Sequence, residues 1–320
     1  MNNKVDVLII GLGNIAYKYD LNLKKSYVLT HLRAFEQHKG FNVVGVVDNS
    51  LEAIKNFSIK FNYRTFLSIK DALKTLNPDL VVISSPMNTH LKVVNEIFNL
   101  SSPKYLVCEK PLADSYDNSQ KLIQICKKFN CQLFINYQRN SSITTDLIKE
   151  KILTNYFEPP YKIVMWYSKG LVNTASHFIT LFNLFFGKVQ NIKIINSKIS
   201  EFYFKLDYND CEAFFMPVSS DFFYNSFEMV CKNGKLVYEN GGEYSNWYPI
   251  DQLNNSYSNY KILSSKAESL KSDFYSSQLS FVNNIWKFIQ GKKYSICMSE
   301  NVIDTLEIIN YLKIKSNEIR

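Results

Sequence analysis

Residues 5–16 read Val5-Asp6-Val7-Leu8-Ile9-Ile10-Gly11-Leu12-Gly13-Asn14-Ile15-Ala16 and are the first indication of the fold class. The first six predict a short apolar strand, and the Gly-x-Gly-x-x-Ala after it is typical of a turn that holds a dinucleotide. In such a turn the first glycine allows a tight bend, the second lets the backbone approach a pyrophosphate, and the alanine packs a helix on the strand. We therefore expect Gly11, Gly13, Asn14 and Ile15 to bind a dinucleotide. An ordinary turn is the alternative.

Strand and helix patterns alternate over the first 137 residues. The strand segments are short, apolar and β-branched, as expected when helices cover both faces of a sheet. Such alternation predicts right-handed βαβ units and a doubly wound parallel sheet, the Rossmann arrangement. We expect strands at Val5–Ile10, Asn42–Val47, Tyr63–Phe66, Leu80–Ser84, Tyr105–Cys108 and Gln132–Tyr137, and helices at Thr30–His38, Leu51–Phe61, Ile69–Leu76, Thr89–Asn99 and Ser115–Phe129.

The pattern changes after Tyr137. Residues 189–248 alternate aromatic and β-branched side chains and contain Asn233-Gly234, a strong hairpin signal, so they predict an antiparallel sheet. A length of 320 residues also favours two cores. We therefore expect two domains, residues 1–138 and 139–320. Further expected elements are a strand at Tyr161–Ser168 and helices at Thr174–Phe186, Ser277–Gln290 and Glu300–Lys315.

The net charge of +8 does not indicate a nucleic-acid partner. Only four of the 37 basic residues are arginines, and the lysines are scattered along the chain, whereas a nucleic-acid surface usually clusters its cations. No apolar run approaches the 18 residues of a membrane span, and the N-terminus shows no signal peptide. We expect neither a nucleic acid nor a membrane as partner.

The six cysteines form no C-x-x-C pair, and no histidine stands at metal-ligand spacing from them. Scattered cysteines in a chain without a signal peptide are typical of reduced thiols in a cytoplasmic protein. The expectation is therefore a cytoplasmic protein with no metal site.

Asp48 follows the second expected strand, where a carboxylate can hold the ribose hydroxyls of NAD and repel the 2′-phosphate of NADP. NAD is therefore the expected cofactor, with NADP the less favoured one; a helix cap before Leu51 is the other interpretation. Ala16 and Asp48 are 32 residues apart, where about 20 is usual. The excess lies in residues 17–29, which we interpret as a lid near cofactor or substrate that includes Tyr17, or as a disordered surface loop.

Two further strand ends carry polar residues. Ser84-Ser85-Pro86-Met87-Asn88-Thr89-His90 follows the fourth strand, and we expect Ser85, Pro86, Asn88 and His90 to lie near the nicotinamide ribose, although His90 could simply begin a helix. Glu109-Lys110-Pro111 follows the fifth strand and places a carboxylate and an ammonium where open α/β sheets bind ligands. A surface salt bridge is the alternative there.

Together these motifs resemble the Gfo/Idh/MocA family of sugar oxidoreductases. The resemblance includes Lys169-Gly170-x-x-Asn173-x-x-x-His177 in the second half. It implies an N-terminal Rossmann domain and a C-terminal α/β domain with an open, mostly antiparallel sheet, which often builds a dimer or tetramer face. It also implies NAD(P)-dependent hydride transfer at a CH–OH group of a sugar derivative bound between the domains. That derivative could be a sugar nucleotide or a surface-glycan precursor.

By this resemblance Glu109 and Lys110 lie at the cofactor, and Lys110 binds the substrate oxygen that changes between alcohol and ketone. His177 suits acid–base chemistry because its ordinary pKa is near neutral. Asn173 stands where the family has Asp, so it can orient substrate but not take a proton; Thr180 also replaces an Asp. A free polyol or cyclitol dehydrogenase, or a non-catalytic NAD-binding regulator, remain alternatives.

Several of these residues have a second interpretation. His177 could be a core histidine among phenylalanines, and Tyr137 and Arg139 could contact substrate or belong to an ordinary hinge. The aromatic stripe at Phe202, Tyr203, Phe204, Phe214 and Phe215 fits sheet core or an oligomer face better than a sugar platform.

Overall fold

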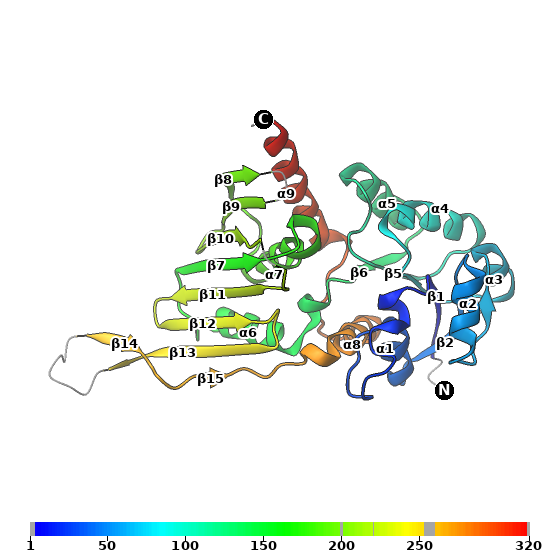
Figure 1. Ribbon diagram of the computed structural model, residues 1–320, viewed down its shortest axis with the longest axis horizontal. Coiled ribbons are helices and arrows are strands. Elements are labelled where there is room, and N and C mark those ends of the chain that lie inside the picture. The colour runs from blue at the N-terminus through cyan, green and yellow to red at the C-terminus, as the bar shows by residue number, and fades with distance from the viewer. Residues whose placement is uncertain (1–3, 199–200, 220, 253–259, 319–320) are drawn as a thin grey trace. The chain divides into compact units, whose positions relative to one another are not determined.

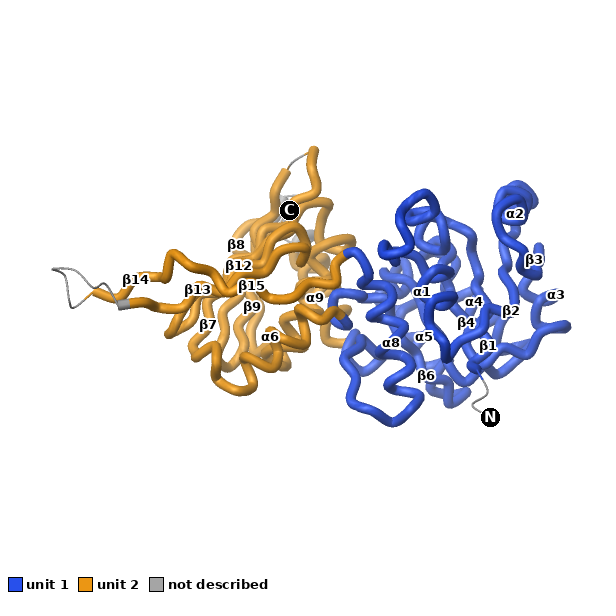
Figure 2. The backbone as a smooth tube through the Cα atoms, turned by 90° about the horizontal axis from the view of Figure 1, so that it is seen from below, with its two compact units in different colours: residues 1–141, 275–302 blue, residues 142–274, 303–320 orange. Residues whose placement is uncertain are grey.

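The computed structural model describes residues 4–198, 201–219, 221–252 and 260–318, and its chain forms two compact units (Figures 1 and 2). Unit 1 contains residues 1–141 and 275–302, and unit 2 contains residues 142–274 and 303–320. These units differ from the expected division at residue 138, because the chain returns to unit 1 with residues 275–302. In the described part of the chain, no helix combines the length and apolar character needed to cross a membrane.

Unit 1 is built on a six-stranded parallel sheet with the order β3-β2-β1-β4-β5-β6, which confirms the expected doubly wound arrangement. The order reverses between β1 and β4, the point where such sheets bind ligands. The strands are β1 (Val5–Ile10), β2 (Phe41–Val47), β3 (Thr65–Phe66), β4 (Leu80–Ile83), β5 (Tyr105–Cys108) and β6 (Gln132–Ile135).

Four helices of unit 1, α1, α2, α3 and α5, begin at a residue whose hydroxyl caps the first turn. The side chains of Thr30, Ser50, Ser68 and Ser115 each accept a hydrogen bond from a backbone N–H in the first turn of the helix that follows. α3, α4 and α5 pack in series, and α1 packs against α8 from the returning segment. The helices are α1 (His31–Gln37), α2 (Leu51–Ser58), α3 (Ile69–Thr75), α4 (His90–Leu100), α5 (Tyr116–Lys128) and α8 (Ser277–Ile289).

Among the residues that the structure describes, unit 2 is built on a nine-stranded sheet in which only β7 and β10 pair in parallel, so the expectation of a mostly antiparallel sheet is confirmed. The Asn233-Gly234 turn joins β11 to β12 as expected. The strands are β7 (Tyr161–Tyr167), β8 (Asn191–Lys198), β9 (Glu201–Asp207), β10 (Cys211–Pro217), β11 (Asn225–Cys231), β12 (Gly234–Glu239), β13 (Tyr244–Gln252), β14 (Lys261–Leu263) and β15 (Glu268–Ser269).

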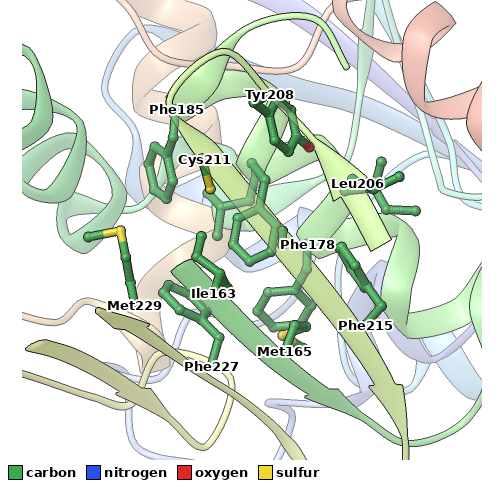
Figure 3. Packing of buried hydrophobic residues seen from close by; sticks show 14 of the residues in the cluster. Ile163, Met165, Phe178, Phe185, Leu206, Tyr208, Cys211, Phe215, Phe227 and Met229 are labelled. Carbon is green, nitrogen blue, oxygen red and sulfur yellow. The ribbon is translucent and has the colours of Figure 1, made fainter. Parts of the chain in front are cut away.

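One face of this sheet forms the core of unit 2. β7 alternates strictly, with Ile163 and Met165 buried and Val164 and Trp166 exposed on the opposite face. The buried face packs on aromatic residues of α7 (Ser176–Phe186), among them Phe178 (Figure 3). Of the expected aromatic stripe, Phe204 and Phe215 stack within this core, with ring centroids 4.5 Å apart. α6 (Ile143–Leu153) and α9 (Ser299–Glu318), whose first turn belongs to unit 1, complete the helices.

Candidate active site

The polar strand ends of unit 1 meet at one edge because all six strands are parallel. A cavity of about 790 Å³ opens at this edge over the ends of β1, β2 and β4, where the strand order reverses. Five of the expected cofactor residues, Gly11, Gly13, Asp48, Ser85 and Pro86, line it. The cavity is also lined by Ile10, Leu12, Lys18, Val47, Asn49, Ala53, Leu67, Ser68, Ile69, Ser84, Thr89, Lys92, Val93 and Glu96.

Asp48 is held in the cavity wall by the backbone of two different loops. Its Oδ2 accepts a hydrogen bond of 2.8 Å from Leu12 N, and its Oδ1 accepts one of 2.9 Å from Ser50 N. The cap of α2 is Ser50, whose side chain accepts from Ala53 N, so the helix-cap interpretation of Asp48 is wrong. Each carboxylate oxygen keeps a lone pair that can accept from a ribose hydroxyl.

The two glycines of the turn have different reasons to be glycine. Gly11 has φ +95°, and a Cβ there would lie 2.7 Å from Ser85 N, so neither the backbone nor the space admits a side chain. A Cβ on Gly13 would meet only Ser84 O, at 3.9 Å, within the distances described. The fold therefore does not require Gly13, whereas a ligand lying against the cavity wall would.

Serine hydroxyls join the turn to the end of β4. Ser84 Oγ donates toward the carbonyl oxygens of Ile10 and Gly11, at 3.0 and 2.9 Å. Thr89 Oγ1 donates to Pro86 O at 2.7 Å, so Ser85 Oγ must donate in its 2.8 Å contact with Thr89 Oγ1. The acceptor lone pairs of Ser85 are left for a donor from a ligand.

Lys110 is half-buried after β5, outside the residues that line the cavity. Burial lowers the pKa of Lys110, and the cation of Arg139 lowers it further, whereas the charge of Glu109 raises it. The net direction is downward, so this lysine releases a proton more readily near neutral pH than an exposed lysine does. The structure thus brings Arg139 into the electrostatic surroundings of Lys110.

His90 does not line the cavity. Its side chain is buried, and Nε2 lies 2.8 Å from Ser85 O while Nδ1 lies 3.1 Å from Leu112 O and 3.3 Å from Cys108 Sγ. Burial raises the pKa of Cys108, so its thiol keeps its proton, and it can donate to Nδ1 in the tautomer whose Nε2–H donates to Ser85 O. His90 thus ties the Ser85 turn to the segment after β5, and its expected contact with a cofactor stays a prediction. The other expected cofactor residues, Asn14, Ile15, Asn88 and Glu109, are likewise absent from the cavity lining.

Tyr17 is a core residue of unit 1, which argues against its expected contact with substrate. It is 4% exposed, and its ring packs edge-on against Phe57 and Phe61, with centroids 5.1 and 5.8 Å away. The π-helical turn Asn14–Lys18 directs it inward. Tyr137 is also buried, at 2% exposed.

The segment after Tyr17 is a folded loop and not a disordered one. The buried carboxylate of Asp20 accepts from Leu29 N and Thr30 N at 2.8 and 3.0 Å and from the Thr30 hydroxyl at 2.9 Å. Arg33 Nη1 donates to three carbonyl oxygens of the same loop, those of Leu23, Lys24 and Tyr27. Only Lys18 of this segment lines the cavity, so these contacts support an anchored loop and leave the expected lid role a prediction.

Asn173 and His177 lie in unit 2, at the start of α7. Lys169 and Gly170 both have positive φ, +62° and +86°, and a π-helical turn, Leu171–Ala175, follows and contains Asn173. Asn173 is exposed, and His177 is 6% exposed. Thr180, at the family's second Asp position, donates to Ser176 O and contacts Thr305 Oγ1. π-turns are frequent at functional sites, which favours a role for this segment.

Sequence reasoning missed several cavity residues. Lys18, Lys92 and Glu96 bring charge to the lining, and Leu67, Ser68 and Ile69 come from the segment after β3. Lys92 and Glu96 are four apart on α4, directly after the Ser85 turn, and that spacing was an available signal. The contribution of the segment after β3 depends on the sheet order and leaves no local trace.

Comparison with known proteins supports the interpretation of unit 1 as an NAD-binding Rossmann fold. Residues 5–137 match the oxidoreductase family with an NAD-binding Rossmann fold, Gfo/Idh/MocA. An uncharacterised oxidoreductase of Schizosaccharomyces pombe is 32% identical over 78 residues, 24% of this chain and 21% of that protein. An inositol 2-dehydrogenase of Rubrobacter xylanophilus is 24% identical over 167 residues, 52% of this chain and 44% of that protein. The aligned parts thus span less than half the length of these relatives.

Solved structures match the fold over nearly the whole chain. An oxidoreductase of Desulfitobacterium hafniense, described as NADPH-dependent, has a TM-score of 0.81 at 15% identity, covering 100% of this chain and 97% of that one. The WlbA dehydrogenase of Bordetella pertussis, solved with NADH and UDP-GlcNAcA, has a TM-score of 0.75 at 16% identity, covering 99% and 98%. Gal80p of Saccharomyces cerevisiae, solved as a super-repressor mutant, has a TM-score of 0.76 at 14% identity, covering 99% of this chain and 96% of that one.

Three observations indicate that unit 1 binds a dinucleotide. They are the glycine turn after β1, the cavity where the strand order reverses, and the family match over residues 5–137. The open space beside Gly13 and the anchored carboxylate of Asp48 fit the pyrophosphate and ribose of a dinucleotide. Residues 5–137 therefore form an NAD-binding Rossmann fold that matches the model of the Gfo/Idh/MocA oxidoreductase family.

Proposed function

We propose that the protein is an NAD(H)-dependent oxidoreductase that interconverts a secondary alcohol and a ketone of a sugar derivative. The observation that carries this proposal is the Asp48 carboxylate, anchored by Leu12 N and Ser50 N in the wall of the cavity. A bound NAD would supply the hydride acceptor, and NADH the donor; the protein positions the reacting groups and handles the proton.

The side chains of the protein would handle the proton, orient the substrate and bind the cofactor. Lys110, with its lowered pKa, would hydrogen-bond the reacting oxygen and exchange its proton. His177 would share that proton, and Asn173, which cannot titrate, would orient a neighbouring hydroxyl. Gly11, Gly13, Asp48, Ser85 and Pro86 would bind the cofactor.

Lys110→Ala tests this assignment. We expect the turnover number to fall by about 10²-fold or more, the usual contribution of a positioned acid or base, with NADH affinity little changed. Lys104→Ala, at an exposed lysine before β5, is the matched control and should keep wild-type turnover. Equal losses of turnover and NADH affinity in Lys110→Ala would contradict the assigned role.

For the substrate, we favour a sugar nucleotide or surface-glycan precursor. The support is the likeness in fold to WlbA, which was solved with UDP-GlcNAcA. The partial match to inositol 2-dehydrogenase supports a free cyclitol or polyol instead. Absorbance at 340 nm across nucleotide-linked sugars, free sugars and inositols, with both cofactor forms, separates the two classes.

A non-catalytic NAD-binding regulator is the second candidate. Two observations favour it. Asn173 stands where the family has Asp and cannot take a proton, and the fold is similar to that of Gal80p, which was solved as a super-repressor mutant. If the wild type is inactive on the whole panel while Asn173→Asp gains turnover, the regulator gains support. Ordinary turnover by the wild type removes it.

The protein also pairs with a second copy through the exposed face of the unit 2 sheet. On that face Val164 and Trp166 of β7 are 37% and 38% exposed, and Phe214 and Met216 of β10 lie beside them in register. Such an apolar sheet face is typical of an interface.

A further inference from the structure

Four polar side chains from four separate parts of unit 1 form a closed ring of hydrogen bonds next to Lys110. They are His31 at the start of α1, Glu109 after β5, Asn136 after β6 and Gln278 in the first turn of α8. We call them the Glu109 network. His31 and Gln278 are 0% exposed, Asn136 is 3% exposed, and the Glu109 side chain is 12% exposed. None of the four lines the cofactor cavity.

The carboxylate of Glu109 determines the direction of every hydrogen bond in this network. An ionised carboxylate only accepts, so Asn136 must present Nδ2 to Oε1, at 2.6 Å. Nδ2 also donates to Gln278 Oε1 at 3.1 Å, which turns Gln278 Nε2 toward Asn136 Oδ1 and His31 Nδ1, at 3.3 and 3.1 Å. His31 Nδ1 is then an acceptor, and its Nε2 carries the proton and donates to Glu109 Oε1 at 2.7 Å.

Each donor of the network therefore has an acceptor in one arrangement only. Flipping either amide would set N–H against N–H or oxygen against oxygen. A buried polar network that is fully satisfied is rigid, whereas a half-satisfied one is costly. Glu109 is consequently held in one position as an anion.

The network reaches Lys110 through Glu109. Glu109 Oε2 accepts a hydrogen bond of 3.2 Å from Lys110 N, so the same carboxylate fixes the backbone of the lysine. The titratable groups around the pair are Arg139, which acts on Lys110, and His31 and Cys108, which lie beside Glu109. Of these charges, the anion of Glu109 opposes the effects of burial and of Arg139 on Lys110.

We propose that His31, Asn136 and Gln278 are positioning residues that hold the Glu109 carboxylate, and through it the Lys110 backbone and ammonium, in the geometry that the reaction needs. The proposal deepens the proposed function and rests on it for the role of Lys110. It also assigns a function to the segment 275–302, which returns to unit 1 and supplies the positioning residue Gln278.

The experiment compares His31→Leu, His31→Gln, Gln278→Leu and Glu109→Gln in the full chain. Gln at position 31 can still donate toward Glu109, whereas Leu cannot. The matched control is Asn284→Leu, which removes another buried amide of α8, bonded to Ser141, Ser280 and Ser295 outside the network. Thermal unfolding and NADH titration show which variants fold and bind cofactor.

The first measurement does not need turnover. Trace acetylation of Lys110 at different pH values, followed by mass spectrometry, gives the midpoint of its titration. We expect Glu109→Gln to lower this midpoint by about one unit, because an attractive charge is lost. His31→Leu and Gln278→Leu should lower it less, His31→Gln should restore it toward the wild-type value, and Asn284→Leu should leave it unchanged.

The second measurement is steady-state kinetics on the substrate found by the panel. His31→Leu should lower the turnover number by about tenfold or more with NADH affinity near that of wild type, as expected for misplacement of a catalytic group. Equal effects of His31→Leu and Asn284→Leu in both measurements would overturn the proposal. If His31→Leu does not fold, His31→Gln and Gln278→Leu carry the comparison. Absence of any wild-type turnover would refute the proposed function while the acetylation result still stands.

Discussion

Asp48 Oδ2 lies 2.8 Å from the backbone nitrogen of Leu12, so the end of β2 is hydrogen-bonded to the glycine turn after β1. This contact holds an anion where the adenosine ribose of a dinucleotide would lie, and it predicts cofactor preference. We expect NADH to bind at least about tenfold more tightly than NADPH, a difference of about 1.4 kcal/mol. Asp48→Ala should reduce that ratio in fluorescence titrations.

Ser50→Ala is the control for Asp48. It removes the cap of α2 and should cost about 1 kcal/mol of stability, but it keeps the backbone N–H that binds Asp48, so the cofactor ratio should not change. Tighter binding of NADPH than of NADH by the wild type would contradict the assignment of Asp48.

The two glycines of the turn should respond differently to alanine. Gly11→Ala places a Cβ 2.7 Å from Ser85 N at a backbone angle of +95°, so the melting temperature should fall markedly. Gly13→Ala has room in the protein and should keep the wild-type melting temperature while weakening NADH binding. Calorimetry and NADH titration of both variants check this, and normal NADH binding by Gly13→Ala would show that no cofactor backbone lies there.

Asp20 should be a stability residue. Asp20→Ala leaves Leu29 N and Thr30 N without their acceptor and removes the ion pair with Arg33 Nε, and we expect the free energy of unfolding to fall by about 2 to 4 kcal/mol. Asp20→Asn keeps one acceptor oxygen and should lose less. Urea unfolding measures both. Unchanged stability together with altered NADH binding would instead favour a lid.

Glu109 should make stability depend on pH. Burial raises its pKa, but hydrogen bonds from His31 and Asn136 and the cation of Lys110 outweigh burial, so the pKa lies below its ordinary value of 4.5. A lowered folded-state pKa stabilises the fold above the unfolded value and loses that contribution as pH falls through the folded value. The stability difference between wild type and Glu109→Gln should be constant near neutral pH and shrink below pH 4.5. Urea unfolding from neutral to acid pH measures it.

Trp166 should control assembly. Trp166→Lys places a charge on the exposed face of the unit 2 sheet and should shift light-scattering mass toward the monomer. Ile59→Lys, at an 81% exposed apolar residue of unit 1, should not. A wild-type protein that is already monomeric at micromolar concentration would contradict pairing through this face.

The strands of unit 1 were predictable because each is a short apolar run bounded by turn residues. β1 and β5 match the expected bounds, and the others differ by one to two residues at their ends. Four of the helices begin within one residue of the expected position, and the hydroxyls of Thr30, Ser50, Ser68 and Ser115 cap their first turns. Asp48 and the glycines were equally accessible because their positions follow from the strand that each one ends.

The roles of side chains that point away from the cavity were not predictable in this way. His90 and Tyr17 stand next to cofactor motifs in the sequence, yet His90 braces two loops and Tyr17 fills the core. Neighbouring residues on a turn can face opposite directions, and only the packed structure determines which one faces the ligand.

By itself the sequence determined the order of strands and helices, the dinucleotide turn and the strand end that carries Lys110, because periodicity, caps and glycines act over a few residues. Only the tertiary structure decided what surrounds that lysine. His31 and Gln278 are 247 residues apart, and they meet at Glu109 because the chain returns to unit 1 after building unit 2. A hydrogen-bond network of this kind depends on where distant backbones come together, which no local pattern records.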